Sequence, residues 1–408
     1  MRVLHINKFF YERGGAERYF FALSELLEAH GHTVISFAMD DPKNRPSPYQ
    51  RFFPSRVDFE NPRGFGALKA LGRMFWSFEV ARKLDALIRE SKPEIAHIHN
   101  IYHQLAPLTV LIVLRKHHIP VVQTLHDYKL VAPNYTLFDR HGICERAKRG
   151  YLRTVLGRCI RGSVWASAVE AVEMSLFRAV GLPKIVARFV APSDFLREKL
   201  GEWGIARERI VVAPLPVSPE AAAHPLGDAV LFLGRLSPEK GVSVLLRAWK
   251  HAPESARLMI AGTGPESQEL QALSESLHLR NVAFLGHVSR ERLPEVFAAA
   301  HCVVVPSRSY EVSPYVILEA GARGIPVIAS RIGGIPELVQ HERTGLLVPP
   351  DDPAALWEAI EALRSNGLRA EALGKALQSR IIVEYDPERH YQVVFLLYQD
   401  ILRRVSTT

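Results

Sequence analysis

The chain has 408 residues, of which 48% are hydrophobic, and a formal net charge of +8. This length exceeds one ordinary core and predicts two or three domains at roughly 150 residues each. The chain has three cysteines without metal-ligand spacing, which disfavours a disulfide scaffold and a zinc domain. We see no run of about 18 apolar residues, which disfavours a membrane span, and no secretory leader pattern. We therefore expect a cytoplasmic protein.

The first half alternates short β-rich apolar runs with helical patterns. A strand at 3–6 leads through Gly14 and Gly15 into a helix at 16–29, which Gly31 is placed to end. One amphipathic helix with interspersed Lys and Arg is predicted at 66–84. Further strands are expected at 33–38, 95–99, 121–126 and 185–192.

The second half repeats this alternation, with strands expected at 229–234, 258–262, 282–286, 302–307 and 326–330. Strands that alternate with helices predict parallel sheets covered on both faces. We therefore predict an α/β protein with two doubly wound, Rossmann-like domains. Their expected ranges are 1–213 and 214–386, with a proline-rich linker at 211–228 and a helix at 387–408 that packs back on the first domain.

Positive charge is concentrated in the first half. Residues 1–216 carry a net charge of +11 and residues 217–408 a net charge of −3. Between Arg140 and Arg161 there are seven basic residues and one acid. Such a field attracts polyanions: nucleic acid, anionic lipid or a phosphorylated substrate.

The stretch "SYEVSPYVILEAGARGIPVIAS" (309–330) predicts an anion site, because ligands of open parallel sheets bind beyond the carboxyl ends of the strands. Ser313 is a suitable N-cap and Pro314 a suitable first residue for a helix that ends before Gly324. The free backbone N–H groups at the start of this helix would then face a phosphate; they belong to Tyr315, Val316 and Ile317.

Two carboxylates flank this helix start. Taken singly, Glu311 and Glu319 are typical of a solvated surface. Beside a bound phosphate, each would have to face neutral donors, and sugar hydroxyls are the obvious candidates.

Other loops at strand ends carry cations and glycines. Arg235 and Lys240 lie between a strand and a helix, where a guanidinium fork and an ammonium suit a diphosphate. Gly262 and Gly264 follow another strand but lack the third glycine of a dinucleotide fingerprint. In the first domain, Gly14 and Gly15 permit close approach to a phosphate.

Histidines are also prominent in the first half. His126 ends a strand on the expected ligand side, next to Asp127. "HIHN" (97–100) with His103 suggests a metal, but we expect alternate strand positions to point to opposite faces, which argues against one. No two aspartates are separated by a single residue, so cations and helix ends, and not magnesium, are expected to neutralise the phosphates.

As a set, "GGAER", "TLHD", "GRLSPEKG", "AGTGPE", "EVSPYVILEA", "GGIPELV" and "TGLLV" resemble glycosyltransferase family 4, retaining nucleotide-sugar transferases with the GT-B fold. The resemblance covers nearly the whole chain. It implies two domains facing across a cleft, and no metal or cofactor beyond the nucleotide-diphosphate sugar that serves as donor substrate.

The resemblance also implies roles for individual residues. Arg235 and Lys240 would hold the donor diphosphate, helped by amides near Val316 and Ile317. Glu311 and His126 would lie beside the transferred sugar. The remaining implied contacts are Glu319 with the ribose, Gly15 with phosphate or acceptor, and Gly262, His287 and Val288 beside the base.

Two departures from the family pattern bear on the substrate. This chain has "EVSP" where many members have "EGFG", so donor choice cannot be transferred from them. The segment 127–163 resembles that of cell-surface polysaccharide enzymes. Its basic residues suit a lipid-diphosphate acceptor or an anionic membrane, which implies a glycan or lipid-linked acceptor and a place on the inner face of the cell membrane.

Three alternatives stay open. A nicotinamide-dependent oxidoreductase shares the domain type but needs the missing third glycine. A nucleic-acid-binding protein would explain the basic half and leave Glu311 and Glu319 without a role, so we expect no nucleic-acid partner. An epimerase or hydrolase of nucleotide sugars would share the fold.

Overall fold

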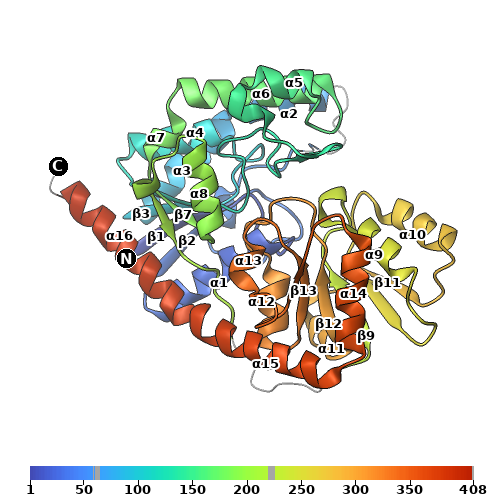
Figure 1. Cartoon of the computed structure of the whole chain (residues 1–408). Coiled ribbons are helices and arrows are strands. Elements are labelled where there is room, and N and C mark those ends of the chain that lie inside the picture. Colours follow the sequence, from blue (N-terminus) through green and yellow to red (C-terminus); the bar gives the residue numbers. More distant parts are fainter. Residues whose placement is uncertain (58, 60–64, 219–225, 407–408) are drawn as a thin grey trace.

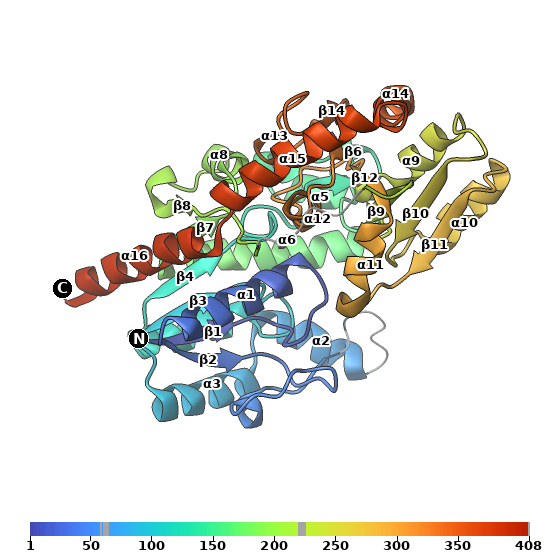
Figure 2. The same cartoon turned by 90° about the horizontal axis from the view of Figure 1, so that it is seen from below.

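A computed structural model describes residues 1–57, 59, 65–218 and 226–406 and places them in two lobes (Figures 1 and 2). The first lobe contains β1 (Arg2–Ile6), α1 (Gly15–Ala29), β2 (Thr33–Phe37), η1 (Gln50–Phe52), α2 (Phe65–Phe75), α3 (Phe78–Ser91), β3 (Ile95–Ile98), α4 (Pro107–Lys116), β4 (Val121–Thr124), β5 (Phe138–Asp139), β6 (Gly142–Ile143), η2 (Arg146–Arg149), α5 (Leu152–Leu156), α6 (Val164–Ala179), α7 (Leu182–Ile185), β7 (Val186–Ala191), α8 (Asp194–Glu202), η3 (Arg207–Arg209) and β8 (Ile210–Val212).

The sheet of the first lobe is parallel, in the order β2-β1-β3-β4-β7-β8. Successive side chains of β1 enter different layers: Leu4 and Ile6 join one buried cluster, whereas Val3 joins the other. This alternation follows from the two-residue repeat of a strand. Helices therefore cover both faces, as predicted.

The second lobe contains β9 (Ala229–Leu233), η4 (Pro238–Lys240), α9 (Val242–Trp249), β10 (Arg257–Ala261), α10 (Ser267–Ser276), β11 (Val282–Gly286), η5 (Arg290–Arg292), α11 (Leu293–Ala298), β12 (Ala300–Val305), α12 (Tyr315–Ala322), β13 (Val327–Ser330), α13 (Ile335–Leu338), β14 (Leu346–Val348), α14 (Pro353–Arg364) and α15 (Gly367–Glu384). Its parallel sheet has the order β11-β10-β9-β12-β13-β14. The predicted α/β class with two Rossmann-like units is confirmed.

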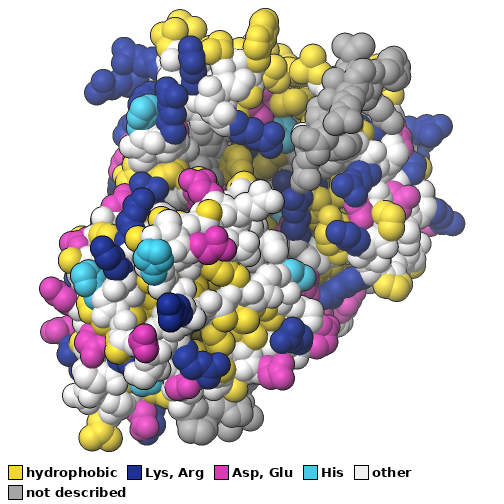
Figure 3. Space-filling model, turned by 90° about the vertical axis from the view of Figure 1, so that its right-hand side faces the viewer, with side chains coloured by type: hydrophobic (Ala, Val, Ile, Leu, Met, Phe, Trp, Pro, Cys, Tyr) yellow, Lys and Arg dark blue, Asp and Glu magenta, His cyan; other side chains and the backbone are white. Residues whose placement is uncertain are grey.

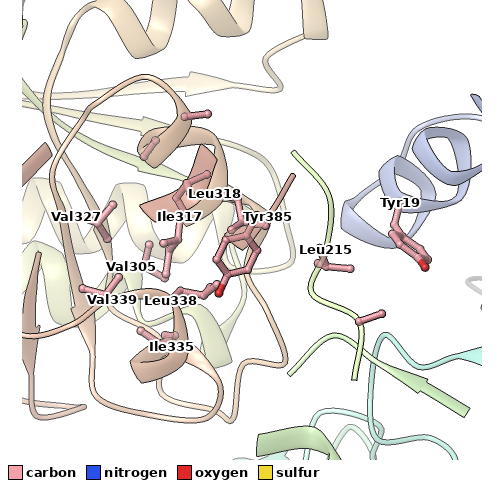
Figure 4. Packing of buried hydrophobic residues seen from close by; sticks show 14 of the residues in the cluster. Tyr19, Leu215, Val305, Ile317, Leu318, Val327, Ile335, Leu338, Val339 and Tyr385 are labelled. Carbon is pink, nitrogen blue, oxygen red and sulfur yellow. The ribbon is translucent and has the colours of Figure 1, made fainter. Parts of the chain in front are cut away.

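The last helix, α16 (Pro387–Ser406), leaves the second lobe and lies along α1 of the first (Figure 1). Tyr398 of α16 is fully buried and hydrogen-bonds His97 of β3 at 2.5 Å. One apolar cluster also spans both lobes. In Figure 4, Leu215 of the connecting segment lies between Tyr385 of the second lobe and Tyr19 of α1.

Two element predictions are wrong, and one strand was missed. The first residues of the proposed linker belong to β8, which pairs with β7. The single helix at 66–84 is two helices, because the Ser77 hydroxyl caps a new helix by accepting from the Val80 N–H at 3.2 Å. The edge strand β14 was not predicted.

Within the described residues, the structure contains no helix with the length and apolar character needed to cross a bilayer.

Candidate active site

In each sheet the strand order reverses at one point, and the loops that leave this point face the other lobe (Figure 1). In the second lobe the change falls between β9 and β12, and in the first between β1 and β3. Such switch points form ligand crevices in open parallel sheets. Figure 3 shows the surface hollowed between the two lobes, with Lys and Arg side chains along the hollow.

Three predicted residues meet at the switch point of the second lobe. Arg235 and Lys240 follow β9, and Glu311 follows β12. Lys240 Nζ donates to Glu311 Oε1 at 2.7 Å, and the Ser307 hydroxyl donates to the same oxygen at 2.6 Å. Arg235 is exposed, and its guanidinium makes no hydrogen bond or ion pair with any described residue.

The expectation that Glu311 faces sugar hydroxyls beside a bound phosphate stays a prediction; in this structure its carboxylate pairs with Lys240. Its carboxylate is buried, and a buried charge needs a partner, which Lys240 supplies. The cation expected to hold a phosphate is thus paired with the acid expected to hold a sugar.

Glycines from the β13–α13 connection support the backbone of Glu311. The Gly334 N–H donates to the Glu311 carbonyl at 2.7 Å. Gly333 has φ +62°, and a Cβ there would lie 2.4 Å from that carbonyl oxygen. A side chain at 333 is excluded, so this glycine fixes how Glu311 is presented.

The start of α12 differs from its prediction. Pro314 occupies the N-cap position, and the Ser313 hydroxyl makes no capping bond. The Ile317 N–H donates to the Pro314 carbonyl at 3.1 Å, which leaves the N–H groups of Tyr315 and Val316 for a ligand. Within the described chain, Ser313 Oγ and Tyr315 Oη are buried without hydrogen-bond partners, a cost that a polar ligand would remove.

Glu319, one turn further along α12, forms an ion pair with Arg18 of α1, across the gap between the lobes. The expected contact of Glu319 with ribose hydroxyls likewise stays a prediction. Arg290 of the second lobe reaches Glu12 of the first at 2.9 Å, and the Glu337 carboxylate accepts from the Asp194 and Phe195 N–H groups at the start of α8. The lobes are thus joined by ionic contacts.

Gly14 and Gly15 form the N-cap and first residue of α1. A Cβ on Gly15 would lie 3.2 Å from the Tyr315 ring, so this glycine permits the close approach of α1 to α12. Gly262 and Gly264 permit a close approach within the second lobe, since a Cβ at either position would lie within about 2.1 Å of the carbonyl oxygens of Gly234 and Leu236. They allow the loops after β9 and β10 to touch, which positions Arg235.

His287 and Val288 follow β11, at the outer edge of the second sheet. His287 is exposed, and Val288 is half-buried against the apolar cluster shared by the lobes. They lie two strands away from the β9–β12 switch point, and no contact with Arg235, Lys240 or Glu311 joins them to it among the described residues.

His126 follows β4 and is half-buried. Its Nε2 lies 3.1 Å from His99 Nδ1, and its ring is 5.4 Å from that of Tyr19. Burial lowers the pKa of His126 to about 3, so the ring is neutral near pH 7.

The expectation about the histidines of β3 is wrong. His97 and His99 are two residues apart, which places them on the same face, and their rings stack at 4.7 Å. His5 of β1 is the register partner of His97. The rule that residues two apart in a strand share one face would have predicted this cluster.

Three charged residues in the first lobe were missed as candidates. Burial raises the pKa values of Glu17 and Asp127 and lowers that of Lys8. Glu17 lies in the first turn of α1, Lys8 directly after β1, and Asp127 after β4. For Lys8 and Asp127, the position just after a strand was the signal available in the sequence.

Among the residues that the structure describes, three clusters have ligand atoms close enough to suggest a metal: His5, His97 and His99; Asp139, Cys144 and Cys159; and His103, Glu170 and Glu173. In each cluster, a hydrogen bond or a cation already occupies groups that would have to bind the metal. His5 Nε2 and His99 Nε2 are 2.5 Å apart, whereas two nitrogens on one zinc lie about 3.3 Å apart for bonds of about 2.0 Å. Arg146 pairs with Asp139, and Lys129 pairs with both Glu170 and Glu173.

Comparison with known proteins agrees with this arrangement. The family model described as Glycosyltransferase Family 4 matches residues 13–221, and the model Glycosyl transferases group 1 matches residues 223–380. Glycogen synthase from Mycobacterium tuberculosis is 27% identical over 395 residues, 91% of this chain and 88% of that protein.

Two further relatives are informative. A GDP-mannose-dependent alpha-(1-6)-phosphatidylinositol monomannoside mannosyltransferase from M. tuberculosis is 30% identical over 236 residues, 55% of this chain and 58% of that protein. The crystal structure of HepE from Anabaena, in complex with UDP and glucose, superimposes with a TM-score of 0.72 at 18% identity and covers 98% of this chain and 100% of that chain. The latter likeness shows the fold.

The two facing parallel-sheet lobes and the family matches define a glycosyltransferase with the GT-B fold. Within that class, the chain belongs to Glycosyltransferase Family 4.

Proposed function

We propose that this enzyme is a retaining glycosyltransferase that moves a sugar from a nucleotide-diphosphate sugar to a glycan or lipid-linked acceptor. The observation that carries the proposal is the convergence of Arg235, Lys240, Glu311 and the start of α12 at the β9–β12 switch point. Cations and free N–H groups suit a diphosphate, and a carboxylate beside them suits sugar hydroxyls.

Donor binding would exchange partners at this point. The diphosphate would take the Lys240 ammonium, and sugar O–H groups would donate to the Glu311 carboxylate in its place. Likewise, ribose hydroxyls would donate to Glu319, which is paired with Arg18 in this structure. Arg18 would keep Glu12, whose carboxylate lies 4.0 Å away, so that no buried ion is left isolated.

The chemical step breaks the bond between the anomeric carbon and the phosphate oxygen and forms a bond to the acceptor oxygen on the same face. The acceptor hydroxyl gives its proton to the departing phosphate. Arg235, Lys240 and the N–H groups of Tyr315 and Val316 would stabilise the negative charge that builds on the diphosphate. Backbone around Gly262, His287 and Val288 would flank the base.

A thermal-shift panel with UDP, GDP, ADP and their sugars tests donor binding, because a ligand that binds the native state raises its melting temperature. The M. tuberculosis relative is named for GDP-mannose and HepE was solved with UDP, so both bases are included. We expect one base to raise the melting temperature well above the others. No shift with any nucleotide would contradict the proposal.

Arg235→Ala and Lys240→Ala test the diphosphate site directly. We expect each to lower kcat by about a hundredfold or more, since each removes a donor aimed at developing charge. The measurement is release of UDP or GDP from the donor that the panel selects. Arg247→Ala, an exposed arginine on α9 of the same lobe, is the control and should leave the rate unchanged.

The acceptor side includes an apolar and basic surface on α5 and α6, which we call the α5–α6 surface. Leu152, Leu156 and Trp165 are 71%, 75% and 82% exposed there. Exposed arginines lie beside them at 149, 153, 158 and 161. Hydrophobic and basic side chains share the upper end of the molecule in Figure 3, the end where α5 and α6 lie in Figure 1.

We infer that this surface rests on an anionic bilayer that carries a lipid-linked acceptor, because apolar insertion and positive charge act together at such surfaces. Co-sedimentation with phosphatidylglycerol vesicles should exceed that with phosphatidylcholine vesicles and fall as salt rises. Trp165→Ser with Leu156→Ser should weaken binding, whereas Leu368→Ser, an equally exposed leucine in the second lobe, should not. Equal binding to both lipids would contradict this inference.

A further inference from the structure

A line of buried side chains connects α1 with His126. Ser24 Oγ lies 2.7 Å from His5 Nδ1, His5 Nε2 lies 2.5 Å from His99 Nε2, and His99 Nδ1 lies 3.1 Å from His126 Nε2. Ser24, His5 and His99 are buried. Both nitrogens of His5 and of His99 are used, so this line is continuous.

Every ring in the line is neutral near pH 7. Burial lowers the pKa values of His5 and His126 to about 3, and that of His99 well below its ordinary value. A neutral imidazole has one N–H and one bare nitrogen. Fixing the proton on one ring therefore fixes it on the next.

The direction of the line is set at Ser24. The Ser24 hydroxyl donates its single hydrogen to the Phe20 carbonyl at 2.8 Å, so its oxygen must accept from His5 Nδ1–H. His5 Nε2 is then bare and accepts from His99 Nε2–H. His99 Nδ1 is bare in turn and accepts from His126 Nε2–H.

The opposite direction has one hydrogen bond fewer. It would turn the Ser24 hydroxyl away from the Phe20 carbonyl and toward His5. The rings cannot easily rotate out of line, because Phe20 stacks on His5 at 4.3 Å and His97 stacks on His99 at 4.7 Å. His97 is itself held by Tyr398 and Thr124 at 2.5 and 2.7 Å.

We propose that Ser24, His5 and His99 are positioning residues that keep the proton of His126 on Nε2, so that its bare Nδ1 accepts a hydrogen bond from a hydroxyl of the transferred sugar. Nδ1 has no partner among the described residues. The placement of the sugar at His126 rests on the proposed function; the direction of the line does not. A bare nitrogen can only accept a hydrogen bond, so it selects a ligand group that donates one. The line of side chains thereby favours a hydroxyl at this position.

The first test needs no substrate. In the full-length protein, deuterated and labelled with 15N-histidine, long-range 1H–15N correlation spectra report which nitrogen of each neutral ring carries the proton. Signals of His126 are assigned by their loss in His126→Gln. We expect the proton on Nε2 in His126 and His99 and on Nδ1 in His5; a proton on His126 Nδ1 would overturn the proposal.

The second test removes the anchor. Ser24→Ala should mix the two tautomers of His126 and lower kcat/KM for UDP or GDP release from UDP-glucose or GDP-mannose by roughly five- to tenfold, the effect of one buried hydrogen bond. Ser24→Thr keeps the hydroxyl and should restore both. Ser175→Ala also loses a hydroxyl bonded to a carbonyl four residues earlier, but it has no histidine partner and should change neither.

The outcomes separate cleanly. Unchanged tautomers in Ser24→Ala would overturn the role of Ser24 even if the variant melts at a lower temperature. If Ser24→Ala does not fold, the wild-type spectrum and Ser24→Thr still decide. If the tautomers are as stated but no nucleotide sugar binds, the proposed function is wrong, whereas the assigned direction of the hydrogen bonds from Ser24 to His126 is confirmed.

Discussion

Glu311 shows how a single site residue depends on the residues around it. Its carboxylate is held by Lys240 and Ser307, and its backbone rests on Gly333 and Gly334. The pattern of cations and acids in the sequence predicted that Lys240 and Glu311 belong to one site. It could not predict that the two charges pair, because pairing depends on how loops from β9 and β12 meet.

Substitution of Gly333 should damage both fold and function. Gly333→Ala combines a positive φ with a Cβ 2.4 Å from the Glu311 carbonyl, and we expect it to lower the free energy of unfolding by at least about 2 kcal/mol and to abolish the nucleotide thermal shift. Gly367→Ala is the control, since a Cβ there meets open space at the start of α15. Denaturant unfolding of both variants measures the difference, and equal stability would refute this account.

The buried histidines make stability depend on pH. Burial lowers the pKa values of His5 and His126 to about 3 and of His390 to about 4, from an ordinary value of 6.5. The unfolded chain takes up protons below pH 6.5 while the native rings stay neutral. Stability is therefore full above pH 6.5 and falls as pH drops toward 4, by up to about 1.4 kcal/mol per pH unit for each ring.

Melting temperatures measured from pH 7.5 down to pH 4.5 should show this fall. Carboxyls with raised pKa values, such as Glu17 and Asp127, bind protons in the native state and offset part of it near the lower end. His390→Asn should reduce the slope, whereas His251→Asn, at an exposed position, should not. A flat profile in the wild type would contradict buried neutral histidines.

At the scale of elements, strand and helix alternation predicted most of both sheets, because apolar β-branched runs and 3.6-residue periods are local signals. The prediction failed for elements that form only through contacts with residues elsewhere in the chain. β8 and β14 are three-residue strands at sheet edges, defined by pairing with β7 and β13. α8 starts at a capping Ser193 that the sequence suggests, but it also depends on Glu337 from the other lobe.

The connection around β6 and α5 contains a contact between two cysteines that the sequence did not predict. Cys144 and Cys159 have no informative spacing, yet their sulfur atoms lie 3.2 Å apart. Burial raises the pKa of Cys144 to about 12, so its thiol is protonated and oxidises slowly. We expect diamide to join the two sulfurs with loss of both thiol hydrogens and to leave Cys302 free.

Thiol titration in denaturant measures this step, with a fall from three free thiols to one. Closing the loop between Cys144 and Cys159 should raise the free energy of unfolding by about 3 kcal/mol. Cys159→Ser is the control and should gain nothing from diamide. Three free thiols after prolonged treatment of the wild type would show that the sulfurs cannot reach bonding geometry.

At the scale of the whole molecule, the two lobes meet through contacts that no local pattern reveals. Arg18 and Glu319 are about three hundred residues apart in sequence and form an ion pair between α1 and α12. The family motifs predicted that both helices border the cleft. They did not predict that a residue proposed for the ribose is occupied by the opposite lobe.

Arg18→Gln should therefore open the ligand-free molecule. We expect a larger radius of gyration by small-angle scattering than in the wild type, reversed by the nucleotide that gives the largest thermal shift. Arg51→Gln, which removes a pair with Glu90 within the first lobe, is the control. An unchanged radius would mean that the other contacts between the lobes suffice to hold them together.

The chain passes between the lobes twice, once after β8 and once between α15 and α16. These two crossing segments touch, because the Val217 N–H donates to the Tyr385 carbonyl at 3.0 Å. Beyond the second crossing, α16 is anchored along α1 and β3. Any displacement of one lobe against the other must therefore bend both segments together, and we expect it to be centred on this one place in the molecule.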